Sequence, residues 1–287
     1  MRIVLAAAVV VCAAAPAAGC GSSRADGGRD VVAAFYPLAW AAEAVAGGTA
    51  TVRDLTPSGA EPHDVELSPR EVARLQRADV VLYVSHGFQP AVEQAVADTT
   101  GTRVDALAGL RLRAGTGDEA GTVDPHVWLD PVRFARVVRR VGVALGRPQR
   151  GDAVAARVLA LDRDYRDGLA HCARRGFVTS HGAFGYLAAR YGLRQVSITG
   201  IDPESEPSAR RLGALVDLVR REHVRTVFFE RLVSPGLART VAREAGATTA
   251  VLDPLEGLTQ AEERRGDTYL SVMRRNLAAL REALGCR

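Results

Sequence analysis

The sequence predicts an α/β protein of two lobes, each a mostly parallel sheet flanked by helices, joined by one long bridging helix. From residue 30 onward, short apolar runs alternate with longer segments that have helical spacing, which is typical of βα units. A chain of 287 residues is long enough for two such units. Between them, residues 150–172 carry apolar side chains three or four apart, with no proline and with no glycine between Gly151 and Gly168. We therefore expect lobes at 30–148 and 173–287 and the bridging helix at 149–172.

The elements follow from these patterns in chain order. Eight apolar runs are the expected strands: 31–35, 51–55, 80–84, 103–105, 176–180, 194–198, 226–229 and 248–252. Besides the bridging helix, periodic segments predict helices at 38–46, from 68 onward, and at 89–97, 132–145, 186–191, 208–223, 236–245 and 268–284. Ser68 is a suitable N-cap because Pro69 follows it at the first helical position. Residues 109–122 are an expected loop.

The N-terminus has the pattern of an export signal. Arg2 precedes an apolar run at 3–15, which is too short for a comfortable membrane span, and small residues follow up to Cys20. The small-small-Cys ending resembles the bacterial lipoprotein signal, in which cleavage leaves the cysteine acylated. Residues 1–19 are then a signal peptide and 20–29 a flexible tether. An ordinary signal peptide with an incidental cysteine is the alternative.

Export also places the remaining cysteines in a compartment where a disulfide can form. Cys12 leaves with the signal peptide and Cys20 takes the lipid, so Cys172 and Cys286 remain as an even pair in an oxidising compartment. A disulfide between them would tie the C-terminus to the start of the second lobe. Two separate thiols are the alternative.

The charge distribution argues against nucleic-acid binding. The net charge is +4 and the pI about 9.1, but acidic residues and arginines are interspersed and no basic block occurs. A nucleic-acid site needs a concentrated basic footprint. We expect a monomer that binds no nucleic acid.

Three histidines and one aspartate stand where predicted strands end. His126 lies in a turn bounded by Pro125 and Pro131, and the others are His63, His181 and Asp253. Ligands of open α/β sheets bind outside the carboxyl ends of the strands. Three imidazoles and one carboxylate, two from each half, would form a four-coordinate site suited to Zn²⁺. Separate local hydrogen bonds for each histidine are the alternative.

Four motifs resemble those of the zinc- and manganese-binding lipoproteins of ABC importers. They lie in the right order at 61–69 (Glu-Pro-His-Asp-Val-Glu-Leu-Ser-Pro), 124–131 (Asp-Pro-His-Val-Trp-Leu-Asp-Pro), 180–187 (Ser-His-Gly-Ala-Phe-Gly-Tyr-Leu) and 252–255 (Leu-Asp-Pro-Leu). The resemblance implies an extracytoplasmic solute-binding protein, anchored to the cell membrane, with the metal between two lobes bridged by a helix. It also implies delivery of the ion to a membrane permease, with His63, His126, His181 and Asp253 as ligands.

The third motif bears on the choice of metal. In this family a glutamate at that position goes with Mn²⁺ and a histidine with Zn²⁺, so His181 favours zinc, in line with the softer character of imidazole. Manganese preference is the closest rival. Many zinc-specific relatives carry a His-rich loop before the second motif, whereas residues 114–120 contain no histidine.

Two further residues are candidates for the rim of the site. Glu61 could supply another oxygen ligand or orient an imidazole. His86 also ends a strand and could be a ligand or a residue at the lip of the cleft. No catalytic residue is expected. A secreted zinc hydrolase would need an open metal position and a base, for which Glu61 is the one candidate, and an adhesin-type surface lipoprotein would use the fold without transport.

Overall fold

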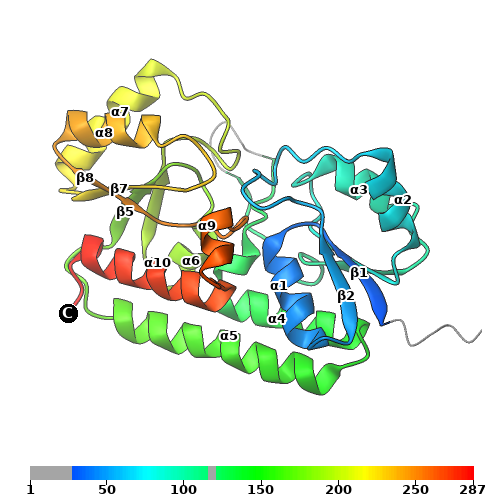
Figure 1. Cartoon of the computed structure of the whole chain (residues 1–287). Helices are drawn as coiled ribbons and strands as arrows, with labels where there is room; N and C mark the ends of the chain where they lie inside the picture. The colour runs from blue at the N-terminus through cyan, green and yellow to red at the C-terminus, as the bar shows by residue number, and fades with distance from the viewer. Residues whose placement is uncertain (1–27, 116–120) are drawn as a thin grey trace, which may run out of the picture.

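The computed structural model describes residues 28–115 and 121–287 and shows two lobes, each built on a parallel four-stranded sheet (Figure 1). The fold class expected from the sequence is confirmed. The signal peptide at 1–19, Cys20 and the tether up to residue 27 lie outside the described residues, as do residues 116–120 of the expected loop. Within the parts that are described, no helix has both the length and the apolar character needed to cross a membrane.

The first lobe contains the sheet β2-β1-β3-β4. Its strands are β1 (Arg29–Ala33), β2 (Ala50–Asp54), β3 (Val80–Tyr83) and β4 (Thr102–Asp105). Its helices are α1 (Tyr36–Ala46), α2 (Pro69–Arg77), α3 (Pro90–Val96) and α4 (Pro131–Ala144). Strand β3 is apolar throughout and β1 is apolar and buried from Val31 to Ala33, as expected for parallel strands covered on both faces.

The second lobe repeats this strand order as β6-β5-β7-β8. Its strands are β5 (Gly176–Thr179), β6 (Arg194–Ser197), β7 (Thr226–Phe229) and β8 (Thr248–Val251). Its helices are α6 (Gly185–Arg190), α7 (Ala209–Arg221), α8 (Gly236–Ala245), α9 (Gln260–Arg264) and α10 (Tyr269–Leu284). His63 follows β2, His181 follows β5 and Asp253 follows β8, so both lobes place candidate ligands beyond the carboxyl ends of their strands.

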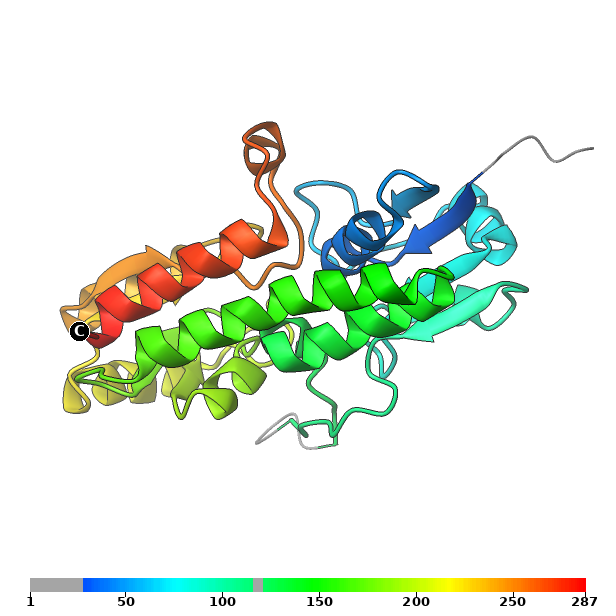
Figure 2. The same ribbon diagram turned by 90° about the horizontal axis from the view of Figure 1, so that it is seen from below.

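Helix α5 (Pro148–Leu169) runs along both lobes, as Figure 2 shows from below. It turns its predicted apolar stripe inward, against α4 and α1 near its start and against α10 near its end. Tyr165, near its end, is fully buried and donates a hydrogen bond of 2.7 Å to the carbonyl oxygen of Met273 in α10. The helix ends three residues earlier than the periodic pattern suggested. One rigid element thus underlies the two sheets.

Helices α4 and α5 approach each other closely at a pair of glycines. A Cβ atom added at Gly142 would lie 2.7 Å from the Cα atom of Gly151. Both residues are buried. Side chains at these positions would push the two helix backbones apart, so glycine is required by the packing.

A disulfide joins Cys172 to Cys286, which confirms the pairing inferred from the cysteine count. It links the segment after α5 to the segment after α10, 114 residues apart. Backbone hydrogen bonds accompany it, with Ala173 N–H donating to the carbonyl oxygen of Gly285. The end of the chain is thereby fixed to the end of the bridging helix.

Two short elements were not expected from the sequence. A single 3₁₀ turn, η2 (Val127–Leu129), follows His126, and α9 precedes α10. Helix α9 begins with a capping box in which Thr259 and Glu262 bond reciprocally. The N-cap expected at Ser68 is confirmed, with Glu71 completing the same motif.

Candidate metal centre

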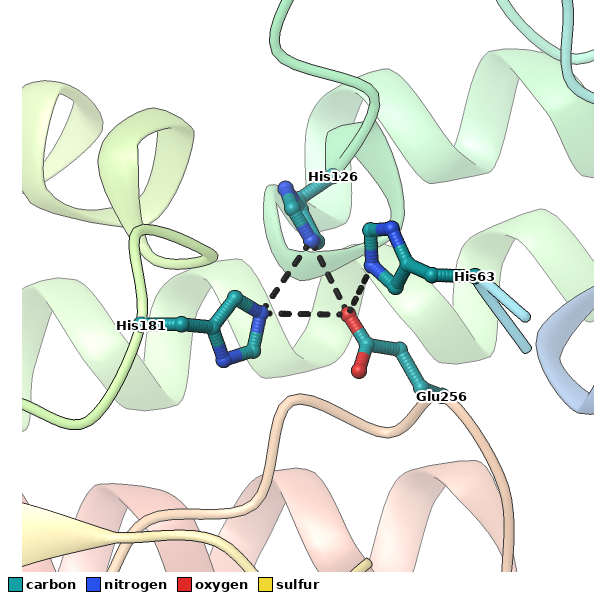
Figure 3. Close-up of side chains that lie close together, drawn as sticks. All are labelled: His63, His126, His181 and Glu256. Carbon is teal, nitrogen blue, oxygen red and sulfur yellow. Dashed lines mark hydrogen bonds and ion pairs between the residues drawn. The ribbon is translucent and has the colours of Figure 1, made fainter. Parts of the chain in front are cut away.

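Three of the predicted residues meet between the lobes, together with Glu256 (Figure 3). His63 lies in the loop between β2 and α2, His126 directly precedes η2, and His181 lies two residues beyond β5. Glu256 comes from the loop between β8 and α9. One donor atom from each of the four side chains lies within 4.8 Å of all the others. The structure thus brings the three predicted imidazoles together.

The four side chains converge on one carboxylate oxygen. Glu256 Oε1 lies 2.9 Å from His126 Nε2, 3.4 Å from His181 Nε2 and 3.6 Å from His63 Nε2. The Nε2 atoms of His126 and His181 are 3.4 Å apart. All three imidazoles thus present the same ring nitrogen to the centre, as the dashed lines in Figure 3 show.

Two outer carboxylates hold the rings in this orientation. Asp124 Oδ1 lies 2.9 Å from Nδ1 of His126 and also accepts the His126 backbone N–H at 3.0 Å. Glu230 Oε1 lies 2.8 Å from Nδ1 of His181. A carboxylate can only accept at these distances, so each Nδ1 carries a proton and each Nε2 is directed toward the centre. Histidines that bind metals have this kind of partner in most proteins.

Neighbouring charges and burial shift the pKa values of the side chains at the centre in opposite directions. Burial alone would lower the pKa of His181, but Glu230 and Glu256 outweigh it and raise that pKa well above its ordinary value. The same balance, with Asp124 and Glu256, raises the pKa of His126. Burial would raise the pKa of Glu256, yet the imidazoles hold it well below the usual range. Without a metal, the carboxylates therefore favour proton binding by His126 and His181.

Asp253 does not lie with the histidines, and the expected ligand set is corrected at this position. Its Oδ1 accepts the backbone N–H of Leu255 at 2.8 Å, and its Oδ2 lies 3.8 Å from Arg231 Nε. The carboxylate therefore closes its own turn. Leu255 then adopts a left-handed φ of +59°, and the chain turns so that Glu256 enters the centre instead.

The two candidates for the rim occupy different environments. Glu61 accepts the backbone N–H of His63 at 3.4 Å, and its Oε2 is buried with no hydrogen-bond partner among the described residues. Burial, together with Glu256, raises the pKa of Glu61 to about 9. His86 is exposed and lines a cavity beside His63. Neither residue belongs to the group of four donors.

Three carboxylates of the site were missed as ligands or supports. Asp124 stands inside a motif already singled out, two residues before His126. Glu230 directly follows β7, which is the same strand-end position that identified the histidines. Glu256 lies five residues beyond the end of β8, and the strand end itself pointed to Asp253.

The donor set matches the preferences of zinc. Zn²⁺ is commonly four-coordinate and takes imidazole nitrogen and carboxylate oxygen. The side chains of His126, His181 and Glu256 are 0–1% exposed and that of His63 is 11% exposed. Such a centre can bind a cation while excluding most of the surrounding water.

Curated proteins similar to this chain include zinc-binding proteins. The chain is 37% identical over 283 residues to the zinc-binding lipoprotein AdcA of Streptococcus pneumoniae, an alignment that covers 90% of this chain and 56% of AdcA. The chain thus spans about half the length of the AdcA proteins it matches. It is 33% identical to the high-affinity zinc uptake system protein ZnuA of Bacillus subtilis, with 93% of both chains covered.

Solved structures agree with this similarity. The laminin-binding protein Lmb of Streptococcus agalactiae, described as a bifunctional protein with adhesin and metal transporting activity, matches with a TM-score of 0.82 at 32% identity, covering 90% of this chain and 99% of Lmb. The Zn(II)-bound ZnuA-like domain of Streptococcus pneumoniae AdcA matches with a TM-score of 0.76 at 36% identity, covering 90% and 99%. The family model described as zinc-uptake complex component A, periplasmic, matches residues 31–283, and this chain therefore belongs to that family.

Proposed function

We propose that this protein is the zinc-binding subunit of an ABC importer, which captures Zn²⁺ between its lobes and delivers it to a membrane permease. The observation that supports this most directly is the convergence of His63, His126, His181 and Glu256 within 4.8 Å. Each lobe contributes two of the four donors. Binding of the ion would therefore join the lobes at one point, which suits a protein that must hold and then release its cargo.

Zinc is proposed as the cargo in preference to manganese. Three imidazoles and a single carboxylate form a softer donor set than Mn²⁺ prefers, and the solved AdcA relatives are described as Zn(II)-bound. The affinity order of divalent metals also favours zinc over manganese at such a site.

We further propose that the protein is a monomer outside the cytoplasm, held at the membrane by a lipid on Cys20. Cys20 follows an export signal in the sequence, and the disulfide between Cys172 and Cys286 suits an oxidising compartment. The family description also names a periplasmic protein.

Transport explains the site better than the two rival functions do. A catalytic zinc keeps one position open for water, whereas here four protein donors would fill a tetrahedral shell. We therefore propose no enzymatic activity. Adhesion of the kind named for Lmb would leave the four buried donors without a role, and zinc capture gives them one.

A metal titration of residues 21–287, prepared metal-free, tests the proposal. We expect one tight equivalent of Zn²⁺, much weaker binding of Mn²⁺, and strong loss of zinc binding in His181→Ala. His223→Ala is the matched control, because His223 is exposed at the end of α7. Absence of stoichiometric binding of either ion would overturn the proposal, and tight Mn²⁺ binding with weak Zn²⁺ binding would reassign the cargo.

A further inference from the structure

We propose that zinc reaches the centre through a cavity beside His63, and that His86 on the rim of this cavity binds the ion transiently and sets its rates of entry and exit. The inference rests on the proposed function, since it concerns the path of the same ion. In this proposal His86 affects the rates of zinc entry and exit, but it is not a ligand of the ion bound at the centre.

Solvent reaches the centre from one side. The side chains of His126, His181 and Glu256 are at most 1% exposed, and that of His63 is 11% exposed. An ion that arrives from solution must therefore pass His63. The Nε2 atom of His63 has no hydrogen-bond partner among the described residues and lies 3.6 Å from Glu256 Oε1, so an ion that passes His63 meets the inner carboxylate next.

A cavity of about 250 Å³ lies in front of His63. His63 and Phe88 form part of its wall, His86 and Asp64 contribute from the first lobe, and Asp202 contributes from the second lobe. The residues that line it thus include polar groups from both sides of the junction. This volume is large enough for an ion that retains part of its hydration shell.

The polar groups of the cavity suit a cation in transit. Asp64 and Asp202 give its walls a negative charge, which concentrates cations near the opening. His86 offers an exposed imidazole, a ligand type that zinc accepts readily. Exchange of one bound water for this imidazole would begin dehydration before the ion reaches His63.

The backbone of His86 determines the choice of variant. His86 has a left-handed φ of +70°, which most side chains adopt only at a cost, and Gly87 follows with +85°. Asparagine tolerates this conformation better than most residues do. His86→Asn therefore removes the imidazole while preserving the turn.

A transient ligand has a kinetic signature of its own. The bound ion is held by the four inner donors and not by His86. Loss of His86 therefore raises the energy barrier between free and bound zinc without changing the energy of either state. The association and dissociation rates should fall by the same factor, and the equilibrium Kd should stay unchanged. A ligand of the bound state would instead weaken the Kd through faster dissociation.

The experiment compares wild type, His86→Asn and His223→Asn by stopped-flow fluorescence. Trp128 serves as the reporter because its ring lies 5.0 Å from that of His126, and excess chelator initiates zinc release. His223→Asn is the matched control, since His223 is also exposed and has a left-handed φ of +51°. We expect both rates to fall about three- to tenfold in His86→Asn and to stay at wild-type values in the control.

Each other outcome rejects the inference. Unchanged rates in His86→Asn would show that the ion does not use this residue, and a weakened Kd with a normal association rate would make His86 a ligand. Asp202→Asn provides a second variant, for which we expect slower association that is sensitive to salt. Equilibrium binding by the wild type tests the proposed function separately, so failure of the kinetic prediction leaves zinc capture standing.

Discussion

Glu256 is a fully buried carboxylate that faces three imidazole nitrogens. Its Oε1 is hydrogen-bonded to His126 and forms ion pairs with His181 and His63, while its Oε2 has no hydrogen-bond partner among the described residues. A buried carboxylate oxygen without a partner is energetically costly. A cation bound between the four side chains would compensate this charge, so we expect Glu256 to contribute strongly to metal affinity.

Glu256→Gln and Asp253→Asn should therefore have different effects on zinc affinity. We expect Glu256→Gln to weaken zinc binding by at least about a hundredfold, because loss of even an outer partner of a metal ligand costs about 10- to 100-fold. Asp253→Asn should bind zinc with nearly wild-type affinity, because its carboxylate lies in a separate turn. Competition with a chelator of known affinity measures both, and an equal loss in the two variants would contradict the assignment.

The raised pKa values of His126 and His181 predict a pH dependence. Zinc must displace protons from these rings, so affinity should decrease on acidification, beginning above the ordinary imidazole pKa of about 6.5. In the metal-free protein the same groups stabilise the fold fully below about pH 6.5, and this contribution is lost as pH rises through the raised values.

Thermal unfolding with and without zinc measures both effects together. The increase in Tm that zinc causes should be larger at about pH 8 than at about pH 6. An increase independent of pH would mean that the histidines do not bind protons and zinc competitively.

Glu256, one of the three carboxylates not predicted from the sequence, shows the limit of the strand-end rule. The rule applies directly to His181, which lies just beyond β5, and less directly to His63, nine residues beyond β2, and to His126, which precedes η2. It also selected Asp253, because it locates a residue at the edge without giving the direction of its side chain. Glu256 depends on the left-handed turn at Leu255, and a leucine does not signal such a turn.

Among the elements, the strands and most helices were predictable from the sequence, whereas η2 and α9 were not. The stripe of α5 repeats over 22 residues and is therefore distinct in the sequence. Helix α9 has only five residues, too few for a periodic pattern, although Thr259 and Glu262 form a recognisable cap. Which helices touch depends on side-chain packing, so the contact of α4 with α5 could not be predicted.

That helix contact is testable at Gly142. Gly142→Ala should destabilise the protein by about 1–3 kcal/mol, because the new methyl group would meet the backbone of α5. Gly213→Ala in α7 is the matched control, since no atom lies within 4 Å of the point where its new Cβ would stand. We expect that control to gain about 0.5–1 kcal/mol from helix propensity. Chemical denaturation measures the free energy of unfolding of both variants. Equal changes in this free energy would argue against the close approach of α4 and α5.

At the scale of the whole molecule, direct hydrogen bonds join the lobes around the metal centre. Trp128 Nε1–H donates to the carbonyl oxygen of Pro254 at 2.7 Å, and the Tyr269 hydroxyl donates to that of Trp128 at 2.6 Å. Gly59 N–H donates to the carbonyl oxygen of Leu258 at 3.0 Å. The bonds to Pro254 and Leu258 hold the Glu256 loop to the first lobe, and that of Tyr269 ties α10 to it.

We therefore expect only a small change of shape on zinc binding. Small-angle scattering of the metal-free and zinc-loaded protein should give closely similar radii of gyration, because α5 and the bonds between the lobes oppose a wide hinge motion. A large compaction on loading would contradict this expectation. Local motion of loops would remain compatible with it.

The buried core extends through both lobes without interruption. One continuous set of packed apolar side chains includes Val31, Phe134, Phe177 and Leu284, and a smaller set lies beneath α7 and α8. A fragment that ends after the bridging helix would retain His63 and His126 but would expose the apolar surface that α10 covers. We therefore expect that neither half of this protein folds alone, and that His63 and His126 keep their places only when both lobes are present.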